Sequence, residues 1–213
     1  MRVLVGCEYS GTVRDAFTAR GHDAISCDFL PTDKPGKHYQ GNVFDIINDG
    51  FDLAIFHPTC TFLCGSGARW FYHPEDKHLP IEQRRPHPKY PNRKQDQKDA
   101  FEFFMQLYNC NIPKIAVENP IGVVSRLFRK PDQVVQPWMF GDEASSFTCL
   151  WLKNLPLLTP TKIVGRGEFI THKSGVKKPK WYADALNLPP KERMKIRSKT
   201  FQGIADAMAE QWG

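Results

Sequence analysis

The chain has 213 residues, of which 41% are hydrophobic and 24% are charged, and it carries a net charge of +6. This length allows one domain with a core of its own, and the composition is ordinary for a globular protein. No apolar run approaches the roughly 20 residues of a membrane span, and the N-terminus MRVLVGCEYSG lacks the apolar region of a signal peptide. We therefore expect no membrane partner and a cytoplasmic location.

The cysteines do not form the patterns of a structural staple. No Cys-x-x-Cys pair occurs, so neither a disulfide framework nor a zinc ribbon is expected. Cys60 and Cys64 lie four residues apart with His57 and His73 nearby, but no second pair of ligands follows them. We therefore expect no metal site.

Short apolar runs alternate with helical patterns along the chain. Strands are expected at Val3–Val5, Ala24–Cys27, Leu53–Phe56 and Ile115–Val117. Apolar residues three and four apart predict helices from Val13 to Arg20, from Gln95 to Tyr108, and around Ile204, Met208 and Trp212. This alternation predicts an α/β protein with a doubly wound, mostly parallel sheet.

Polar residues follow each expected strand. Glu8 to Gly11, Asp28, Cys60 and Glu118 all stand just beyond an apolar run. In a doubly wound sheet the carboxyl ends of the strands form the ligand site. The shared placement therefore predicts one site that contains all four.

The first turn, Gly6 to Gly11, and the acidic residue Asp28 suit a cofactor that contains adenosine. Glycines let the backbone approach a ligand, and a carboxylate after the next strand can accept hydrogen bonds from ribose hydroxyls. An ordinary strand-to-helix turn with a surface aspartate is the alternative interpretation of the same residues.

Cys60 is the candidate nucleophile, because His-Pro-Thr-Cys-Thr is a turn at the functional edge of the sheet. Cys7, Cys27, Cys110 and Cys149 fit inert core positions instead. Glu118-Asn119-Pro120 ends the next strand, where a partly desolvated carboxyl can donate to a ring nitrogen. A simple turn or cap carboxylate is the alternative for Glu118.

Two stretches interrupt the alternation. Residues 70–94 contain five prolines and predict a long, partly mobile loop after Cys60. Residues 162–199 carry eleven Lys or Arg against three acidic residues, a local charge of +8, which favours either a phosphate-contacting surface or a solvated loop. We expect a catalytic domain at 1–158 with the loop 61–98, a small irregular basic segment at 159–197, and a returning helix at 198–213.

Together these motifs resemble the cytosine-5 DNA methyltransferases, most closely the compact members typical of phage genomes that lack a full target-recognition domain. Leu4–Gly11 is similar to the family's cofactor loop, Pro58-Thr59-Cys60-Thr61 to its Pro-Pro-Cys-Gln element, and Glu118-Asn119-Pro120 to its Glu-Asn-Val element. The resemblance implies a Rossmann-like methyltransferase fold and S-adenosyl-L-methionine as the cofactor. The cofactor-binding residues it implies are Gly6, Cys7, Glu8, Tyr9, Ser10, Gly11, Asp28, Phe29, Asn42, Val43, Pro58, Ser198 and Thr200.

The resemblance also implies a mechanism. Cys60 would add to carbon 6 of cytosine, with Glu118 at ring nitrogen 3 and Asn119 beside it as the third catalytic residue. The partner would be DNA, as a duplex with the target base flipped out or as a single strand. The DNA-binding residues that we expect are Arg69, Arg84, Arg85, Lys173, Lys177, Lys178, Lys180 and Trp181. A phage-encoded protein would work in the host cytoplasm.

The chain departs from the family after Phe140-Gly141, where a Gln-x-Arg-x-Arg element is absent and Arg69 and Arg126 are the candidate replacements. Only the basic residues 153–197 occupy the place of the recognition domain. Two alternatives therefore stay open: the same chemistry on a free pyrimidine nucleotide, and a DNA-binding relative without catalysis.

Overall fold

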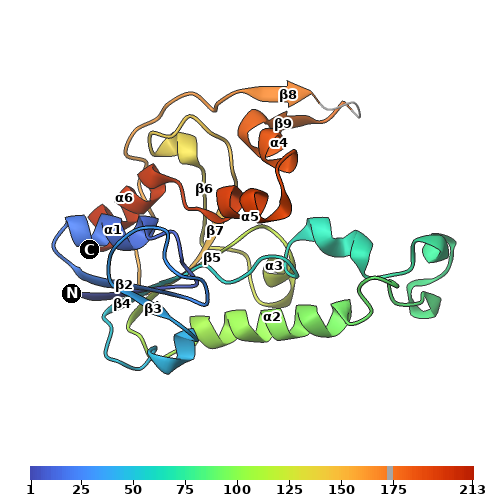
Figure 1. Cartoon of the computed structure of the whole chain (residues 1–213), viewed down its shortest axis with the longest axis horizontal. Helices are drawn as coiled ribbons and strands as arrows, with labels where there is room; N and C mark the ends of the chain where they lie inside the picture. Colours follow the sequence, from blue (N-terminus) through green and yellow to red (C-terminus); the bar gives the residue numbers. More distant parts are fainter. Residues whose placement is uncertain (172–174) are drawn as a thin grey trace.

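A seven-stranded sheet forms the centre of the computed structural model, which describes residues 1–171 and 175–213 (Figure 1). Its spatial order is β3–β2–β1–β4–β5–β7–β6, and β7 alone runs against the other strands. The expected doubly wound, mostly parallel sheet is therefore confirmed. The strands are β1 (Arg2–Gly6), β2 (Asp23–Asp28), β3 (His38–Gln40), β4 (Leu53–Phe56), β5 (Lys114–Asn119), β6 (Gln133–Val135) and β7 (Thr148–Lys153).

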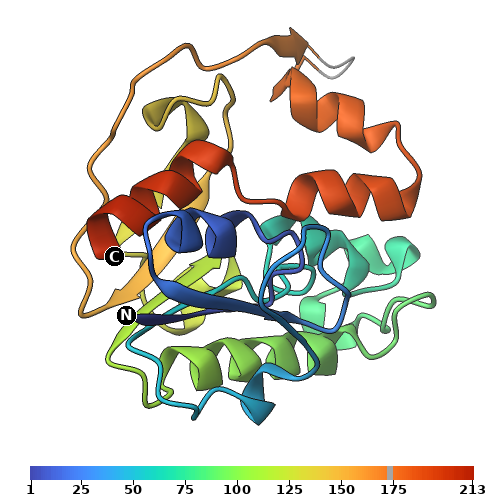
Figure 2. The same cartoon turned by 60° about the vertical axis from the view of Figure 1, so that its left-hand side comes forward.

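Helices cover both faces of the sheet, and the side chains of the strands alternate between them. Val3 and Val5 of β1 pack on one face with α1 (Thr12–Ala19) and α6 (Gln202–Trp212). Leu4 packs on the other face with α2 (Arg93–Tyr108) (Figures 1 and 2). β4 lies between β1 and β5 and is buried on both sides, which explains its uninterrupted apolar sequence.

The chain reverses its direction of travel across the sheet between β1 and β4. From β1 it moves outward through β2 to β3, and it then returns to place β4 on the other side of β1. Loops at such a switch point diverge, and the crevice between them is where ligands bind in open α/β sheets. The turn after β1 and the turn that carries Cys60 after β4 flank this crevice.

Sequence analysis did not foresee three of the strands. β3 and β6 have three residues each, too few to show a periodic pattern. β7 has the sequence TCLWLK, is buried over Cys149–Leu152, and lies between β5 and β6. A short helix, α3 (Val123–Leu127), and two single turns of 3-10 helix, η1 (Val43–Asp45) and η5 (Pro137–Met139), complete this part of the fold.

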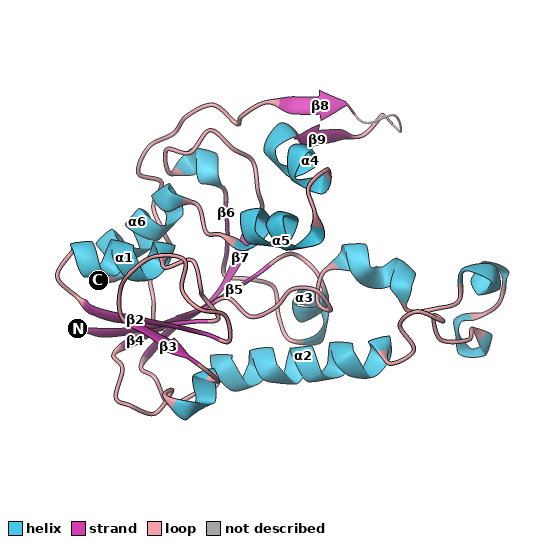
Figure 3. Cartoon of the chain, viewed as in Figure 1, coloured by secondary structure: helices cyan, strands magenta, loops and turns pink. Residues whose placement is uncertain are grey.

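The loop after Cys60 is more ordered than its composition predicts. It contains three 3-10 helices, η2 (Gly65–Trp70), η3 (Pro74–His78) and η4 (Ile81–Gln83), and it protrudes from the body of the molecule (Figure 3). The rings of Trp70, His87 and Tyr90 pack on one another at its base. α2 already begins at Arg93, so the loop is shorter than the expected range 61–98.

The basic segment 159–197 is not irregular, contrary to expectation. It forms a two-stranded sheet of β8 (Phe169–Thr171) and β9 (Lys177–Pro179), followed by α4 (Lys180–Leu186) and α5 (Pro190–Ser198). No residue of α5 is fully buried, so its sequence lacks the apolar stripe that identifies a helix. The segment packs over the carboxyl edge of the main sheet through α5, as the contacts of the site show.

Within the described ranges, no helix combines the length and the apolar character needed to cross a membrane. In the same residues, no three His, Cys, Asp or Glu side chains come together as a metal site would require.

Phe104 tests the face of the sheet that α2 covers. This side chain is fully buried and meets the Trp151 ring edge to face, with centroids 5.3 Å apart. Phe104→Ala should lower the free energy of unfolding by about 3–5 kcal/mol, the cost of emptying a large buried site. The measurement is urea denaturation. Ile163→Ala, at a side chain that is 72% exposed, is the control and should change stability by less than about 0.5 kcal/mol.

Candidate active site

The turn after β1 is fixed by a buried carboxylate. Glu8 is 5% exposed and accepts hydrogen bonds from the backbone N–H of Val13 (2.8 Å) and of Arg14 (3.3 Å), and from the Ser10 hydroxyl (3.0 Å). It therefore caps α1, whose first N–H groups would otherwise lack partners. Cys7 adopts the left-handed conformation with φ 60°, which is uncommon for a residue other than glycine. The turn is thus held in a strained, defined shape.

Glycines at the two ends of this turn are required by the protein itself. A Cβ on Gly6 would lie 2.5 Å from the Phe56 ring, because β1 and β4 approach closely there. Gly11 precedes α1 with φ 72°, a conformation that favours glycine. Gly6 and Gly11 do not line the cavity described below, whereas Cys7, Glu8, Tyr9 and Ser10 between them do.

The loop after β2 is held by Arg14, which is 1% exposed. Its guanidinium donates to the Thr32 hydroxyl (3.2 Å) and to the carbonyls of Lys34 and Pro35 (both 3.1 Å). At the start of this loop, Asp28 Oδ1 accepts the Leu30 N–H (2.9 Å), and Oδ2 makes no hydrogen bond to any described residue. Asp28 thus presents a free carboxylate oxygen to the cavity.

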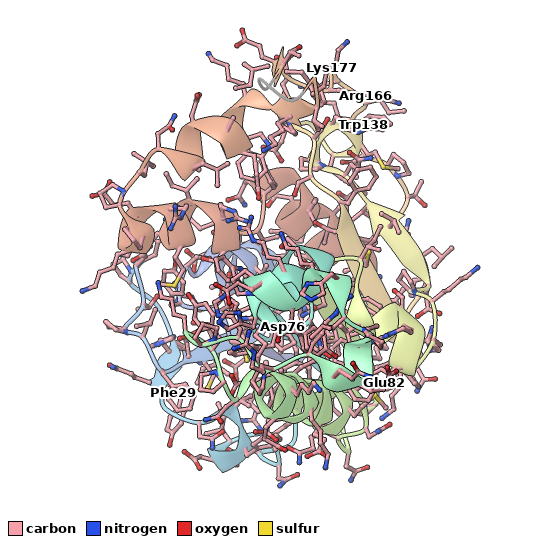
Figure 4. All side chains as sticks on the ribbon, turned by 90° about the vertical axis from the view of Figure 1, so that its right-hand side faces the viewer. Phe29, Asp76, Glu82, Trp138, Arg166 and Lys177 are labelled. Carbon is pink, nitrogen blue, oxygen red and sulfur yellow. The ribbon has the colours of Figure 1, made fainter. Side chains whose placement is uncertain are left out.

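Three further cofactor candidates border the same region. Asn42 caps η1 by accepting the Phe44 N–H (3.2 Å), and Val43 is buried under the turn. Phe29 is 73% exposed and lies on the opposite end of the molecule from Lys177 (Figure 4). Both Phe29 and Asn42 line the cavity, so an aromatic face and an amide lie beside Asp28.

The turn that carries Cys60 is held from two directions. The buried Asn119 donates its side-chain N–H to the carbonyl of Pro58 (3.1 Å). From α2, the buried Arg93 donates to the carbonyl of Thr61 (2.7 Å) and packs over the Phe62 ring. These bonds fix the backbone on either side of Cys60, so the position of its thiol is determined by β5 and α2.

Glu118 lies one strand away and pairs with His57. His57 Nδ1 is 3.3 Å from Glu118 Oε2, and the two side chains are 9% and 28% exposed. No other described residue forms a hydrogen bond with the Glu118 side chain. Arg69 and Arg126, the candidate replacements for the family's arginines, are therefore not bonded to it.

One cavity of about 660 Å³ joins these parts. It is lined by the proposed catalytic residues Cys60, Glu118 and Asn119, and by the cofactor candidates except Gly6 and Gly11. Of the DNA-binding candidates in the described residues, Trp181 alone lines it. The sheet edge thus brings together residues from the ends of β1, β2, β4 and β5, as the sequence predicts.

α5 forms the roof of the cavity and is tied to the loops beneath it. The Ser198 hydroxyl lies 3.0 Å from the Tyr9 hydroxyl, and Lys195 and Lys199 each reach the Asp33 carboxylate at 3.1 Å. The hydrogen bond from Lys195, with Lys199 beside it, holds the pKa of Asp33 below its usual range. The basic helix is therefore anchored to the cofactor side of the cavity.

The charges around Cys60 oppose one another. The pKa of its thiol is raised to about 11, first by the loss of water around it and then by the negative charge of Glu118 and by Cys64, while Arg197 acts in the lowering direction. A thiolate forms more readily when positive charge lies near. Arg197, which lines the cavity from α5, is the described cation that acts on this thiol.

The remaining DNA-binding candidates lie on two surfaces outside the cavity. In the protruding loop, Arg69 packs over the Trp70 ring, Arg84 donates to backbone carbonyls and Arg85 pairs with Asp76 (2.6 Å). On the small sheet, Lys177 and Lys178 are in β9, and Lys180 pairs with Glu168 (3.0 Å). Arg166 packs over the Trp138 ring, and both are labelled with Lys177 at the same end of the molecule in Figure 4. Lys173 lies outside the described residues.

Trp181 is not the free stacking surface that the sequence suggests. Its indole N–H donates to the carbonyl of Ser145 (3.1 Å), and its ring meets Tyr182 and Phe201 edge to face. It is a wall of the cavity and joins α4 to the main domain.

Sequence reasoning missed several residues that shape the site. Arg93 and Arg197 were not singled out, and His57 was noted only in the turn before Cys60, because their contacts join positions far apart in the chain. Arg14 carried one available signal: an arginine among the apolar positions of a short helix with a strong apolar face.

The sequence matches no protein-family model, and no curated protein matches it. Several solved structures have a similar fold. Among them are the Entamoeba histolytica methyltransferase EhMeth (TM-score 0.47, 11% identity, 77% of this chain and 57% of that one), a protein of an E. coli prophage described as a DNA modification methyltransferase (0.42, 14%, 89% and 56%), and the S. pombe Dnmt2 methyltransferase (0.40, 16%, 74% and 50%). The chain spans between 50% and 57% of the length of these proteins. Similarity at this level does not extend to activity, so the functional conclusion depends on the site residues.

The raised pKa of Cys60 predicts how this thiol reacts. Alkylation by iodoacetamide should be slow at neutral pH and should accelerate as the pH rises toward about 11, because the thiolate is the reactive form. Arg197→Gln should slow the reaction further at any lower pH, since it removes the favourable charge. Peptide mass spectrometry at a series of pH values measures both, with Cys60→Ser as the blank. A rate that reaches its plateau near neutral pH would contradict this description.

Proposed function

We propose that this protein is an S-adenosylmethionine-dependent methyltransferase that methylates carbon 5 of cytosine in DNA. One observation carries the proposal: a single cavity places Cys60 and Glu118 beside a fixed glycine-containing turn and the free carboxylate oxygen of Asp28. A thiol and a carboxyl on neighbouring strand ends are the two groups that addition to a pyrimidine ring requires.

The residues at the cofactor end fit the proposed cofactor. Asp28 Oδ2 can accept hydrogen bonds from ribose hydroxyls, and the exposed ring of Phe29 offers a stacking face for adenine. Tyr9, Ser10, Asn42 and Ser198 supply further polar groups along the wall. When bound there, S-adenosylmethionine supplies an electrophilic methyl group.

At the acceptor end, the Cys60 thiol loses its proton to water, and its sulfur then forms a bond to carbon 6 of cytosine. The electrons of the ring double bond shift toward carbon 5 and nitrogen 3, and Glu118 donates a proton to nitrogen 3, which stabilises the developing charge. Carbon 5 thereby becomes nucleophilic and would take the methyl group, with S-adenosylhomocysteine as the leaving group. Loss of the carbon-5 proton to a base, return of the nitrogen-3 proton to Glu118 and release of the Cys60 thiolate restore the aromatic ring.

The charge of the roof favours DNA as the acceptor. α5 and the residue after it carry Lys191, Arg193, Lys195, Arg197 and Lys199, of which Arg197 and Lys199 line the cavity. Such a surface attracts the phosphate backbone, and a cytosine flipped out of the stack could enter beneath it. Under this proposal the protein works in the cytoplasm, that of the host if it is phage-encoded.

A free pyrimidine nucleotide is the second candidate acceptor. The observation that favours it is the roof itself, because α5 is tied to Tyr9 and Asp33 and leaves the cavity partly covered. Transfer of methyl to dCMP but not to DNA would decide for this alternative.

Cys60→Ser should abolish methyl transfer and leave S-adenosylmethionine affinity within a few-fold of wild type. The hydroxyl cannot replace the thiolate as nucleophile, whereas the cofactor contacts lie on other strands. Mass spectrometry of nucleosides from treated DNA measures transfer, and calorimetry measures cofactor binding. Retention of more than about a tenth of the wild-type rate would exclude covalent catalysis by Cys60, since loss of a nucleophile costs many orders of magnitude.

Replacing Lys173, Lys177, Lys178 and Lys180 with Gln should weaken DNA binding. The log–log salt dependence should flatten by up to about 0.9 per lost phosphate contact, and stability should barely change because single surface charges contribute little to it. The control replaces Lys98 and Lys114, on α2 and at the amino end of β5, and should leave the slope unchanged. If the quadruple variant binds DNA like wild type, the protruding loop with Arg69, Arg84 and Arg85 becomes the preferred contact.

A further inference from the structure

His57 is a buried histidine. One of its ring nitrogens contacts the proposed catalytic carboxyl group of Glu118, and the other has no hydrogen-bond partner among the described residues. Nδ1 lies 3.3 Å from Glu118 Oε2, and Nε2 is buried without a hydrogen-bond partner among the described residues. The side chain is 9% exposed and lines the cavity. An orphaned buried nitrogen is costly, so it needs a functional explanation.

The backbone holds this contact in place. The His57 N–H donates to the carbonyl of Gly6 (3.0 Å) at the end of β1, and Glu118 is paired with Leu150 in the ladder between β5 and β7. Both side chains therefore project from fixed strand ends. Glu118 Oε2 faces His57, while Oε1 makes no hydrogen bond to the described residues and is free for the acceptor.

The charges around His57 act in opposite directions. Burial disfavours the imidazolium, but the hydrogen bond to Glu118 and the negative charges of Glu118 and Glu8 together raise the pKa of His57. The other titratable groups near the pair are Cys60, Cys64 and Arg197 in the cavity, and Cys149 on β7, whose thiol pKa is raised by burial and by the negative charge of Glu118. No described residue accepts a hydrogen bond from Nε2. The protonated form of His57 is therefore stabilised only by the negative charges of Glu118 and Glu8.

We propose that His57 is the positioning residue and proton source of Glu118, and that the pair shares one proton which Glu118 delivers to nitrogen 3 of the bound base. This inference rests on the proposed function for the identity of the base. It also accounts for the absence of the family-like arginine pair after Phe140-Gly141, because His57 supplies the positive charge beside the carboxyl.

The transfer balances without another reactant. In the resting pair His57 is the imidazolium and Glu118 the carboxylate. The Cys60 thiol first loses its proton to water. As the thiolate adds to carbon 6, the Nδ1 proton passes to Glu118 Oε2, and rotation of the carboxyl group turns this O–H toward nitrogen 3, which receives the same proton. His57 ends neutral, Glu118 ends as carboxylate, and the negative charge of the thiolate is cancelled at the ring. Elimination of Cys60 returns the proton by the same route.

The first test measures the pair without turnover. The ring Cε1–H signal of His57 is followed by NMR against pH in the full chain, assigned by its loss in His57→Asn. Glu118→Gln should shift the His57 titration midpoint to lower pH, because it removes the nearest negative charge. Glu75→Gln is the control: it removes a carboxylate that lies 3.6 Å from another histidine, His73, and it should leave the His57 midpoint unchanged. An unchanged His57 midpoint in Glu118→Gln would overturn the pair.

The second test measures the proton delivery. His57→Asn keeps an N–H donor near Glu118 but has no second proton to give. Its kcat for methyl transfer to DNA should fall roughly 10²-fold or more at mildly alkaline pH, with KM within a few-fold. The defect should narrow toward acid pH, where Glu118 takes its proton from solvent. A purely structural role would instead give a loss that is equal at all pH values, and that result would overturn the proton source.

The two tests separate this inference from the proposed function. Suppose that wild-type protein methylates no cytosine while Glu118→Gln shifts the His57 titration. The proton shared by His57 and Glu118 is then supported, and its delivery to cytosine is rejected. If wild type is active and His57→Asn keeps its rate within threefold at all pH values, the proposed function stands and the role of His57 falls.

Discussion

The side chain of Asn119 sets the geometry on which the rest of the site depends. It is buried at the end of β5 and donates to the carbonyl of Pro58, so the turn after β4 cannot move relative to β5 without leaving a buried amide unpaired. Cys60 stands on that turn and Glu118 is the neighbour of Asn119 in β5. The distance between the proposed nucleophile and its carboxyl partner is therefore a property of two adjacent strands, which gives the site the rigidity that covalent catalysis needs.

A second set of buried polar groups shapes the cofactor end. The Glu8 carboxylate accepts hydrogen bonds from the N-terminus of α1, and the Arg14 guanidinium donates hydrogen bonds to the loop after β2. The sequence suggests Glu8 as a ligand contact and gives Arg14 no role. In the structure, both side chains mainly bind backbone groups. What remains free for a ligand is a smaller set, notably one oxygen of Asp28 and the Phe29 ring.

The structure gives the basic segment a different role from the one that its sequence suggests. Its charge suggests an arm that reaches toward DNA, but α5 instead lies over the cavity and connects to Asp33 and Tyr9. Lys195 and Lys199, which would attract phosphate, also bind Asp33 and so hold α5 to the loop after β2. Under the proposed function, binding of a nucleic acid strand and access to the cavity would be linked through the same helix.

The sequence by itself determined the central strands, the principal helices and the edge at which the site forms. It could do so because β1, β4 and β5 are buried on both faces and α1, α2 and α6 carry an apolar face, patterns that local composition records. The tertiary structure alone decided the short strands, the regular form of the basic segment, and the pairing of His57 with Glu118. α5 buries none of its residues fully, and His57 and Glu118 are 61 positions apart, so neither leaves a periodic signal. Such contacts exist only when parallel strands bring their ends together, which no stretch of the chain can encode alone.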